Sequence, residues 1–159
     1  MSTFGQYART IVRKGRVEAQ ESGSATIEAE HLLLAMSRQQ GTDAQQMLAS
    51  AGLDYGAIRE ALDREFEQSL SAAGISLAEF DLPDATVHPE RRAPLGASAR
   101  LALERAVKSG VRNRLQPTHL LIGVLGAQVG TVARALALAG VDRADLAERA
   151  RRAITGADE

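Results

Sequence analysis

The segment Glu30–Leu34, with the sequence EHLLL, returns later in the chain at Thr118–Ile122 as THLLI. Two further pairs repeat in the same order: Phe4–Arg9 (FGQYAR) with Leu95–Arg100 (LGASAR), and Leu48–Asp54 (LASAGLD) with Leu136–Asp142 (LALAGVD). Three matches in one order indicate an internal duplication. Stacked helical repeats generally build binding surfaces, so the duplication favours a binding function over catalysis.

Helical spacing of apolar residues dominates both copies, and no segment alternates in the manner of a strand. The fourth helix should begin after Asp54 and bury Ile58, Ala61, Leu62 and Phe66. The pattern predicts eight helices, over about 4–21, 27–39, 43–52, 55–67, 96–109, from Pro117 onward, 131–139 and 143–156.

Residues 68–94 interrupt every helical period with one glycine and three prolines, so they read as a linker containing at most a short helical turn. We therefore expect a first repeat over 1–67, this linker, and a second repeat over 95–159. The predicted fold is all-α: two four-helix repeats, related by a pseudo-twofold axis, packed into one domain.

Composition excludes several classes of protein. The 159 residues carry a formal charge of −1, which disfavours a general nucleic-acid binder. There is no cysteine for a disulfide framework or thiol chemistry. The polar start lacks a signal-peptide pattern, and no apolar run approaches the roughly 20 residues that cross a bilayer. We expect a cytoplasmic protein that binds neither nucleic acid nor membrane.

The repeated landmarks resemble the N-terminal domain of Clp-family ATP-dependent unfoldases, in particular the ClpA and ClpC type. The resemblance covers both repeats, with a helix start that reads Glu-His-Leu-Leu-Leu in the first half and Thr-His-Leu-Leu-Ile in the second, and a Leu-x-x-Ala-Gly-Leu/Val-Asp turn in each half. It implies a mobile platform that docks substrates and adaptor proteins beside other Clp components. Domains of the ClpC type also bind phosphorylated arginine and, in some cases, cyclic-peptide antibiotics.

No Gly-x-x-x-x-Gly-Lys-Ser/Thr phosphate loop occurs in the chain, so it cannot hydrolyse ATP by the family's mechanism. We expect a chaperone-type protein-binding module in ATP-dependent proteolysis, with neither enzymatic activity nor cofactor. It would act as a free-standing accessory or decoy; the alternative is the excised N-terminal domain of a complete ClpC/ClpA-type unfoldase.

The resemblance also implies a peptide- or phosphoarginine-binding set. Glu30 matches the family's motif glutamate and would pair with the guanidinium group; the plainer interpretation is that it complements the helix dipole. Thr118 replaces the second glutamate, which weakens or removes a second site. Glu28 adds a negative charge beside Glu30. Gly5 and Gly96 replace threonines but should leave their backbone N–H groups available to a ligand.

His31 and His119 occupy equivalent positions without any metal-ligand spacing, so we interpret them as structural hydrogen-bonding groups at two helix starts. Phe4 is either core or, with Tyr7, an exposed apolar anchor. A set of basic residues reads either as a solvated helix face or as a docking surface for acidic or phosphorylated partners: Arg9, Arg13, Arg16, Arg100, Arg105, Lys108 and Arg112.

Overall fold

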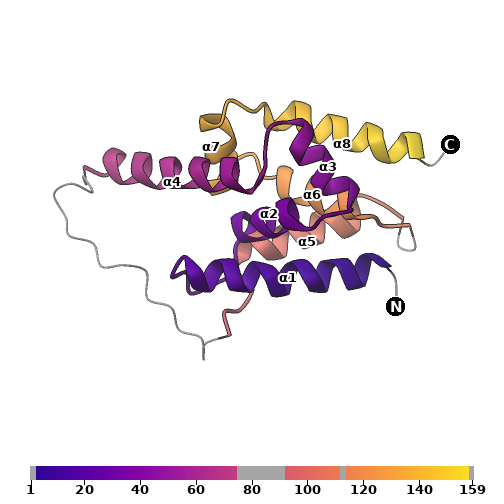
Figure 1. Ribbon diagram of the computed structural model, residues 1–159, viewed down its shortest axis with the longest axis horizontal. Coiled ribbons are helices and arrows are strands. Elements are labelled where there is room, and N and C mark those ends of the chain that lie inside the picture. The colour runs from indigo at the N-terminus through magenta and orange to yellow at the C-terminus, as the bar shows by residue number, and fades with distance from the viewer. Residues whose placement is uncertain (1–2, 75–91, 112–113, 158–159) are drawn as a thin grey trace.

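The computed structural model describes residues 3–74, 92–111 and 114–157 (Figure 1). Within these ranges the chain forms eight α-helices and no strand, which confirms the all-α prediction. The helices are α1 (Thr3–Glu21), α2 (Ala29–Arg38), α3 (Asp43–Ser50), α4 (Tyr55–Ala72), α5 (Ala97–Lys108), α6 (Pro117–Leu125), α7 (Thr131–Leu138) and α8 (Arg143–Ala157).

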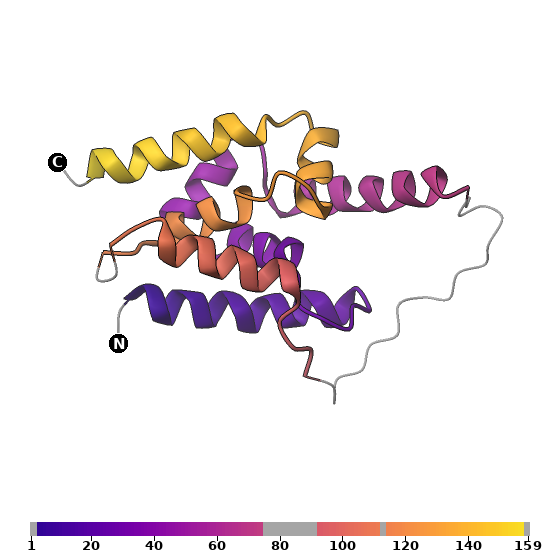
Figure 2. The same cartoon turned by 180° about the vertical axis from the view of Figure 1, so that it is seen from behind.

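The second helix of each repeat lies at the centre of the molecule. The two views in Figures 1 and 2 place α1 and α5 on one side of α2 and α6, and α3, α4, α7 and α8 on the other. Apart from Glu30 and Arg38 all of α2 is buried, and apart from Pro117 all of α6 is buried. Neighbouring helices surround α2 and α6, so the repeated EHLLL and THLLI segments are buried on nearly every face.

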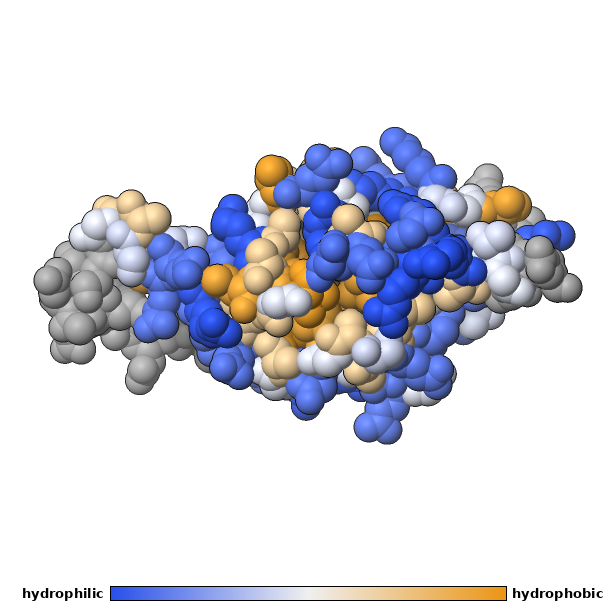
Figure 3. Space-filling view, turned by 90° about the horizontal axis from the view of Figure 1, so that it is seen from above, coloured by the Kyte–Doolittle hydropathy of each residue, from blue (hydrophilic) through white to orange (hydrophobic). Residues whose placement is uncertain are grey.

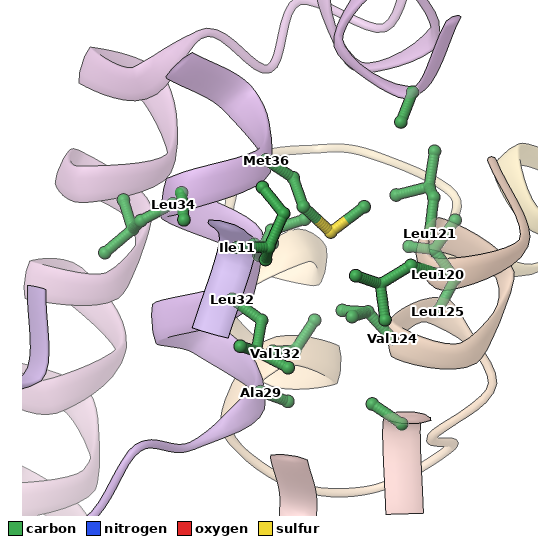
Figure 4. Packing of buried hydrophobic residues seen from close by; sticks show 14 of the residues in the cluster. Ile11, Ala29, Leu32, Leu34, Met36, Leu120, Leu121, Val124, Leu125 and Val132 are labelled. Atoms are coloured by element: carbon green, nitrogen blue, oxygen red, sulfur yellow. The ribbon is translucent and has the colours of Figure 1, made fainter. Parts of the chain in front are cut away.

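The core is continuous across the two repeats. Leu32 and Met36 of α2 face Leu120, Leu121 and Val124 of α6 (Figure 4), and all five side chains are fully buried. Because one apolar cluster joins both halves, we expect neither repeat to fold as an independent unit.

In each repeat a glycine allows the first two helices to approach closely. That glycine lies on the first helix, α1, in the first repeat and on the second helix, α6, in the second repeat. In the second repeat a Cβ on Gly123 of α6 would collide with the carbonyl oxygen of Ala102 in α5. In the first repeat the glycine lies on α1, where a Cβ on Gly15 would lie 3.2 Å from Cδ2 of Leu32. The backbone contact in the second repeat is the tighter of the two.

The turns agree with their sequence signals. The side chain of Thr42 accepts a hydrogen bond from Gln45 N–H at the start of α3, and Asp54 accepts one from Ala57 N–H at the start of α4. Asp142 caps α8 in the same way through Asp145 N–H. Gly52 and Gly140, which follow α3 and α7, have φ values of 76° and 75°, a conformation that favours glycine.

Helix α4 departs from the prediction at its C-terminal end. It continues to Ala72, into the segment expected to be linker, and Phe66 is 54% exposed although it was expected in the core. Helix α4 packs mainly against α7 of the second repeat, whereas α8 packs mainly against α6 of its own repeat. The C-terminal end of α4 extends past the body of the molecule (Figure 1).

Part of the predicted linker forms a defined contact between the repeats. Residues 75–91, which make up most of the predicted linker, lie outside the described residues. After them, Ile27 and Leu95 form an isolated parallel bridge, with Ile27 N–H donating to Pro94 O and Gly96 N–H to Ile27 O, both at 2.8 Å. The bridge brings the starts of α2 and α5 together.

Candidate functional site

The starts of α2 and α5 cap each other across the repeat boundary. The Glu28 carboxylate accepts hydrogen bonds from the Ser98 N–H at 3.3 Å, the Ser98 hydroxyl at 2.8 Å and the Thr26 hydroxyl at 2.8 Å. The Ser98 hydroxyl in turn accepts from the Ala29 N–H at 2.8 Å. Two positive helix ends thus share one carboxylate, which offsets the repulsion between their dipoles.

This arrangement corrects the expectation that the Gly96 N–H is available to a ligand, because that group donates to Ile27 O. It also explains why residue 96 is glycine. A Cβ there would collide with the carboxylate of Glu28. The α5 start is thus already occupied by an anion that belongs to the chain itself.

The two equivalent histidines are structural, as predicted. Nδ1 of His31 accepts the Glu28 N–H at 2.9 Å, and Nδ1 of His119 accepts the Gln116 N–H at 2.8 Å. Acceptance at Nδ1 leaves Nε2 of His31 as the protonated nitrogen, which lies 3.3 Å from the Ser22 hydroxyl. Burial lowers the pKa of His31 from 6.5 to about 4, so the ring is neutral at pH 7.

The remaining predicted site residues do not share one surface. Glu30 is half-buried and lines a pocket beneath α4, and burial, with nearby Glu28 and Glu65, raises its pKa. Thr118 is 2% exposed and Phe4 7% exposed, so a ligand would reach either only after helix movement. Gly5 is half-buried near the start of α1. Of the six, Glu28 and Gly96 lie against each other at the starts of α2 and α5.

A basic groove runs between α1 and α5. It has a cavity volume of about 540 Å³, and Ala8, Val12 and Leu103 supply its apolar lining. Four guanidinium groups surround that lining, and no carboxylate is among the described residues that line it; the guanidinium groups belong to Arg9, Arg13, Arg16 and Arg92. Arg16 Nε also donates to Ala93 O at 3.3 Å, which ties α1 to the segment before α5. The groove offers apolar contact and cationic hydrogen-bond donors together.

Only part of this groove was predicted from the sequence. The Arg9, Arg13 and Arg16 face of α1 was noted, whereas Arg92 was taken as a linker residue. On α5, Arg100 instead donates to Leu95 O and Arg105 to Gly123 O, so both have structural contacts. Arg112 lies outside the described residues.

The face on the other side of the molecule has a different character. Seen from above, apolar residues gather in the middle of that face and hydrophilic residues surround them (Figure 3).

No described helix is both long enough and apolar enough to cross a membrane. Across the described ranges, no group of three or more His, Asp or Glu side chains is placed to hold a metal ion.

A duplicated helical scaffold with charged grooves and mutually capped helix starts has the architecture of a binding domain. Residues 3–80 match the family model of the Clp repeat (R) N-terminal domain. These residues belong to that family, and the whole chain has the fold of a Clp N-terminal domain. None of the curated protein sequences matches the chain.

Two solved structures are similar over almost their entire length. One is the crystal structure of the N-terminal domain of the caseinolytic protease associated chaperone ClpD from Arabidopsis thaliana, with a TM-score of 0.64 and 18% identity over 93% of this chain and 92% of that one. The other comes from preliminary structural investigations of a malarial protein secretion system, with a TM-score of 0.66 and 14% identity over 92% of this chain and 91% of that one. Both show the fold.

Proposed function

We propose that this domain is a non-catalytic docking module of the Clp protease system that binds acidic segments of substrates or adaptor proteins in the α1–α5 groove. The observation that carries this proposal is the groove itself, where Arg13, Arg16 and Arg92 lie beside an apolar lining and none of the described residues that line it is a carboxylate. A segment with carboxylates or phosphates beside an apolar residue complements both parts of that surface.

Arginine-phosphorylated segments are a special case of this ligand class. The α5 start is a poor place for their phosphate, because the Glu28 carboxylate already accepts from the Ser98 N–H there and would repel a second anion. Arg13 and Arg92 in the groove are better placed to bind phosphate. Cyclic peptides with an apolar face would use the same lining of Ala8, Val12 and Leu103.

Calorimetric titration tests the proposal with three matched peptides: one arginine-phosphorylated, one unphosphorylated and one with glutamate at the modified position. We expect the phosphorylated and glutamate peptides to bind and the unphosphorylated peptide to bind at least tenfold more weakly. Arg13→Gln combined with Arg92→Gln should weaken binding by at least tenfold. Arg151→Gln is the matched control, since Arg151 pairs with Glu148 on α8. Equal affinity in the double variant and the control would contradict the proposal.

The place of the domain in a Clp machine is a finer proposal. A free-standing domain would act as an accessory or decoy that competes with the unfoldase for one ligand. The alternative is the N-terminal domain of a complete ClpC/ClpA-type unfoldase. The length of the genomic reading frame distinguishes these two forms, and a competition assay with an intact unfoldase then tests the first.

A further inference from the structure

A second cavity borders α1 on the side that packs against α2, rather than on the side that faces α5 (Figure 1). Its volume is about 330 Å³, at the small end of the roughly 300–1,000 Å³ that is usual for ligand pockets. Val17, which is 48% exposed, and the buried Ala35 give it an apolar wall. Lys14 and Arg38 add two cations beside that wall. We call this cavity the α1–α2 pocket.

The guanidinium group of Arg38 is held in place on two sides. It lies over the ring of Tyr55, 4.4 Å from the ring centroid, and one of its N–H groups donates to the Glu18 carboxylate at 3.4 Å. The Arg38 side chain nevertheless remains 57% exposed, so a ligand can reach it. A surface arginine ordinarily loses conformational entropy when it binds a ligand, and here the ring and the carboxylate have already ordered the side chain.

Glu18 holds this arrangement together from below. It is 5% exposed, and its carboxylate also accepts a hydrogen bond from the Tyr55 hydroxyl at 2.9 Å. Among the described residues that line the pocket it is the single carboxylate. Burying a carboxylate costs free energy that its partners offset only in part, so the ordering of Arg38 is maintained at a cost to stability.

The second cation comes from the other helix. The Lys14 ammonium group donates to the side-chain oxygen of Gln39 at 2.6 Å, which places it next to the residue that follows Arg38. Helices α1 and α2 thus each supply one cation, and Glu18 balances one of the two. The pocket is left with about one net positive charge beside an apolar wall, which matches a ligand that carries one negative charge and one apolar group.

We propose that the α1–α2 pocket binds the free C-terminal carboxylate of a partner protein whose last residue is apolar. The carboxylate would lie between Lys14 and Arg38, whose planar fork suits two parallel hydrogen bonds, and the last side chain would lie against Val17 and Ala35. A terminal residue carries both groups on one Cα atom, so both reach adjoining walls of a small cavity. An internal glutamate would need a second residue for the apolar contact. This site and its ligand are independent of the α1–α5 groove.

The probe is an acetylated five-residue peptide of glycine and serine that ends in leucine, made with either a free C-terminal carboxylate or a C-terminal amide. Calorimetric titration into the full chain should show binding of the free carboxylate and at least tenfold weaker binding of the amide. Lys14→Gln combined with Arg38→Gln should weaken binding of the free carboxylate at least tenfold. Arg151→Gln on α8 is the matched control and should leave binding unchanged.

Three single variants keep the test decisive if the double variant fails to fold, which circular dichroism reports. Lys14→Gln leaves the Arg38–Glu18 pair in place and should weaken binding by about threefold to tenfold. Arg38→Lys keeps the charge but loses the planar fork and its stacking on Tyr55, and should weaken binding by a similar factor of about threefold to tenfold. Val17→Ala should weaken binding of the leucine-ended peptide by about threefold.

Four results would overturn the proposal. Equal affinity for the carboxylate and amide peptides is the first, and unchanged affinity in a folded Lys14→Gln variant is the second. The third is equally tight binding of an amidated peptide with an internal glutamate, which would identify an acidic side chain as the occupant. The fourth is a fall in the mass of the protein alone on Lys14→Gln substitution, measured by sedimentation, which would identify a second copy of the chain.

The same peptide separates this pocket from the α1–α5 groove. It carries no acidic side chain and no phosphate, so Arg13→Gln combined with Arg92→Gln should leave its affinity unchanged. Loss of binding in that variant would place the peptide in the groove and contradict the proposal for the α1–α2 pocket. Because the peptides and variants differ from those for the acidic ligand, each proposal fails independently.

Discussion

The two repeats share one scaffold but differ in the charges they place around it. In both, a histidine three residues after the cap residue accepts the cap N–H, and a nearly all-buried helix follows. The first repeat then carries Glu28 and Glu30, where the second has Gln116 and the buried Thr118. The repeated residues therefore hold the core together, and we infer that the residues that differ decide which surface binds a ligand.

The largest expected difference between the repeats is in the loss of stability when Gly123 or Gly15 is replaced by alanine. Gly123→Ala should destabilise the fold by about 3 kcal/mol or more, because the new methyl group collides with backbone. In Gly15→Ala the new methyl group would lie 3.2 Å from Cδ2 of Leu32 and 3.4 Å from Cγ2 of Ile27, and the gain in helix propensity of up to about 1 kcal/mol offsets these side-chain contacts. Urea unfolding measures both variants, and similar losses in the two would contradict the asymmetry.

The capping carboxylate should give the next largest effect. Glu28→Ala removes the acceptor of the Ser98 N–H and leaves two helix starts facing each other, so we expect a loss of about 1–2 kcal/mol in the free energy of unfolding. Gln116→Ala at the equivalent position of the second repeat is the matched comparison and should cost less than half as much. A larger loss for Gln116→Ala would break the comparison.

The pH dependence of stability provides a separate test of the first repeat. His31 has a folded-state pKa of about 4, below its ordinary value of 6.5, so its contribution is complete above pH 6.5 and is lost as the pH falls through about 4. We expect the free energy of unfolding to decrease over that window by roughly 1–3 kcal/mol from this residue. His31→Gln should flatten the decrease in urea unfolding at pH 7, 5.5 and 4.5; an unchanged slope would contradict the assignment.

The smallest expected effect concerns two equivalent hydroxyl groups. The hydroxyl of Ser98 joins the capping network, whereas that of Tyr7, at the matching position of α1, is buried without a hydrogen-bond partner among the described residues. Burial also raises the pKa of Tyr7. Tyr7→Phe should therefore stabilise the fold by about 0.5–1 kcal/mol, whereas Ser98→Ala should destabilise it by a similar amount or more. Thermal unfolding measures both, and destabilisation by Tyr7→Phe would mean that its hydroxyl has a partner.

The sequence predicted most of the fold because the decisive signals are local. The duplicated motifs, the caps at Thr42, Asp54 and Asp142, and the glycines after α3 and α7 each act within a few residues. The exposure of Phe66 was missed because apolar spacing predicts a helix face but not whether another helix covers it.

The candidate sites were less predictable because they depend on contacts between distant segments. Glu28 and Ser98 meet only once the bridge between Ile27 and Leu95 aligns two helix starts. Arg92 reaches the α1 groove only because its segment runs beside that helix. In the sequence, the pocket beneath α4 was indicated only by two pairs of residues spaced four apart, Arg59 with Asp63 and Leu62 with Phe66. The sequence could not show which helices face these pairs.

Docking of acidic segments in the α1–α5 groove is the function that we propose for this Clp-type domain. The most direct test is a nuclear magnetic resonance titration of the labelled chain with the arginine-phosphorylated peptide. We predict saturable shift changes in the amides of α1 and of residues 92–103, absent in the Arg13→Gln/Arg92→Gln variant and weak at α7 and α8. Shift changes confined to the residues of the pocket beneath α4, or no shift changes at millimolar peptide, would contradict this proposal.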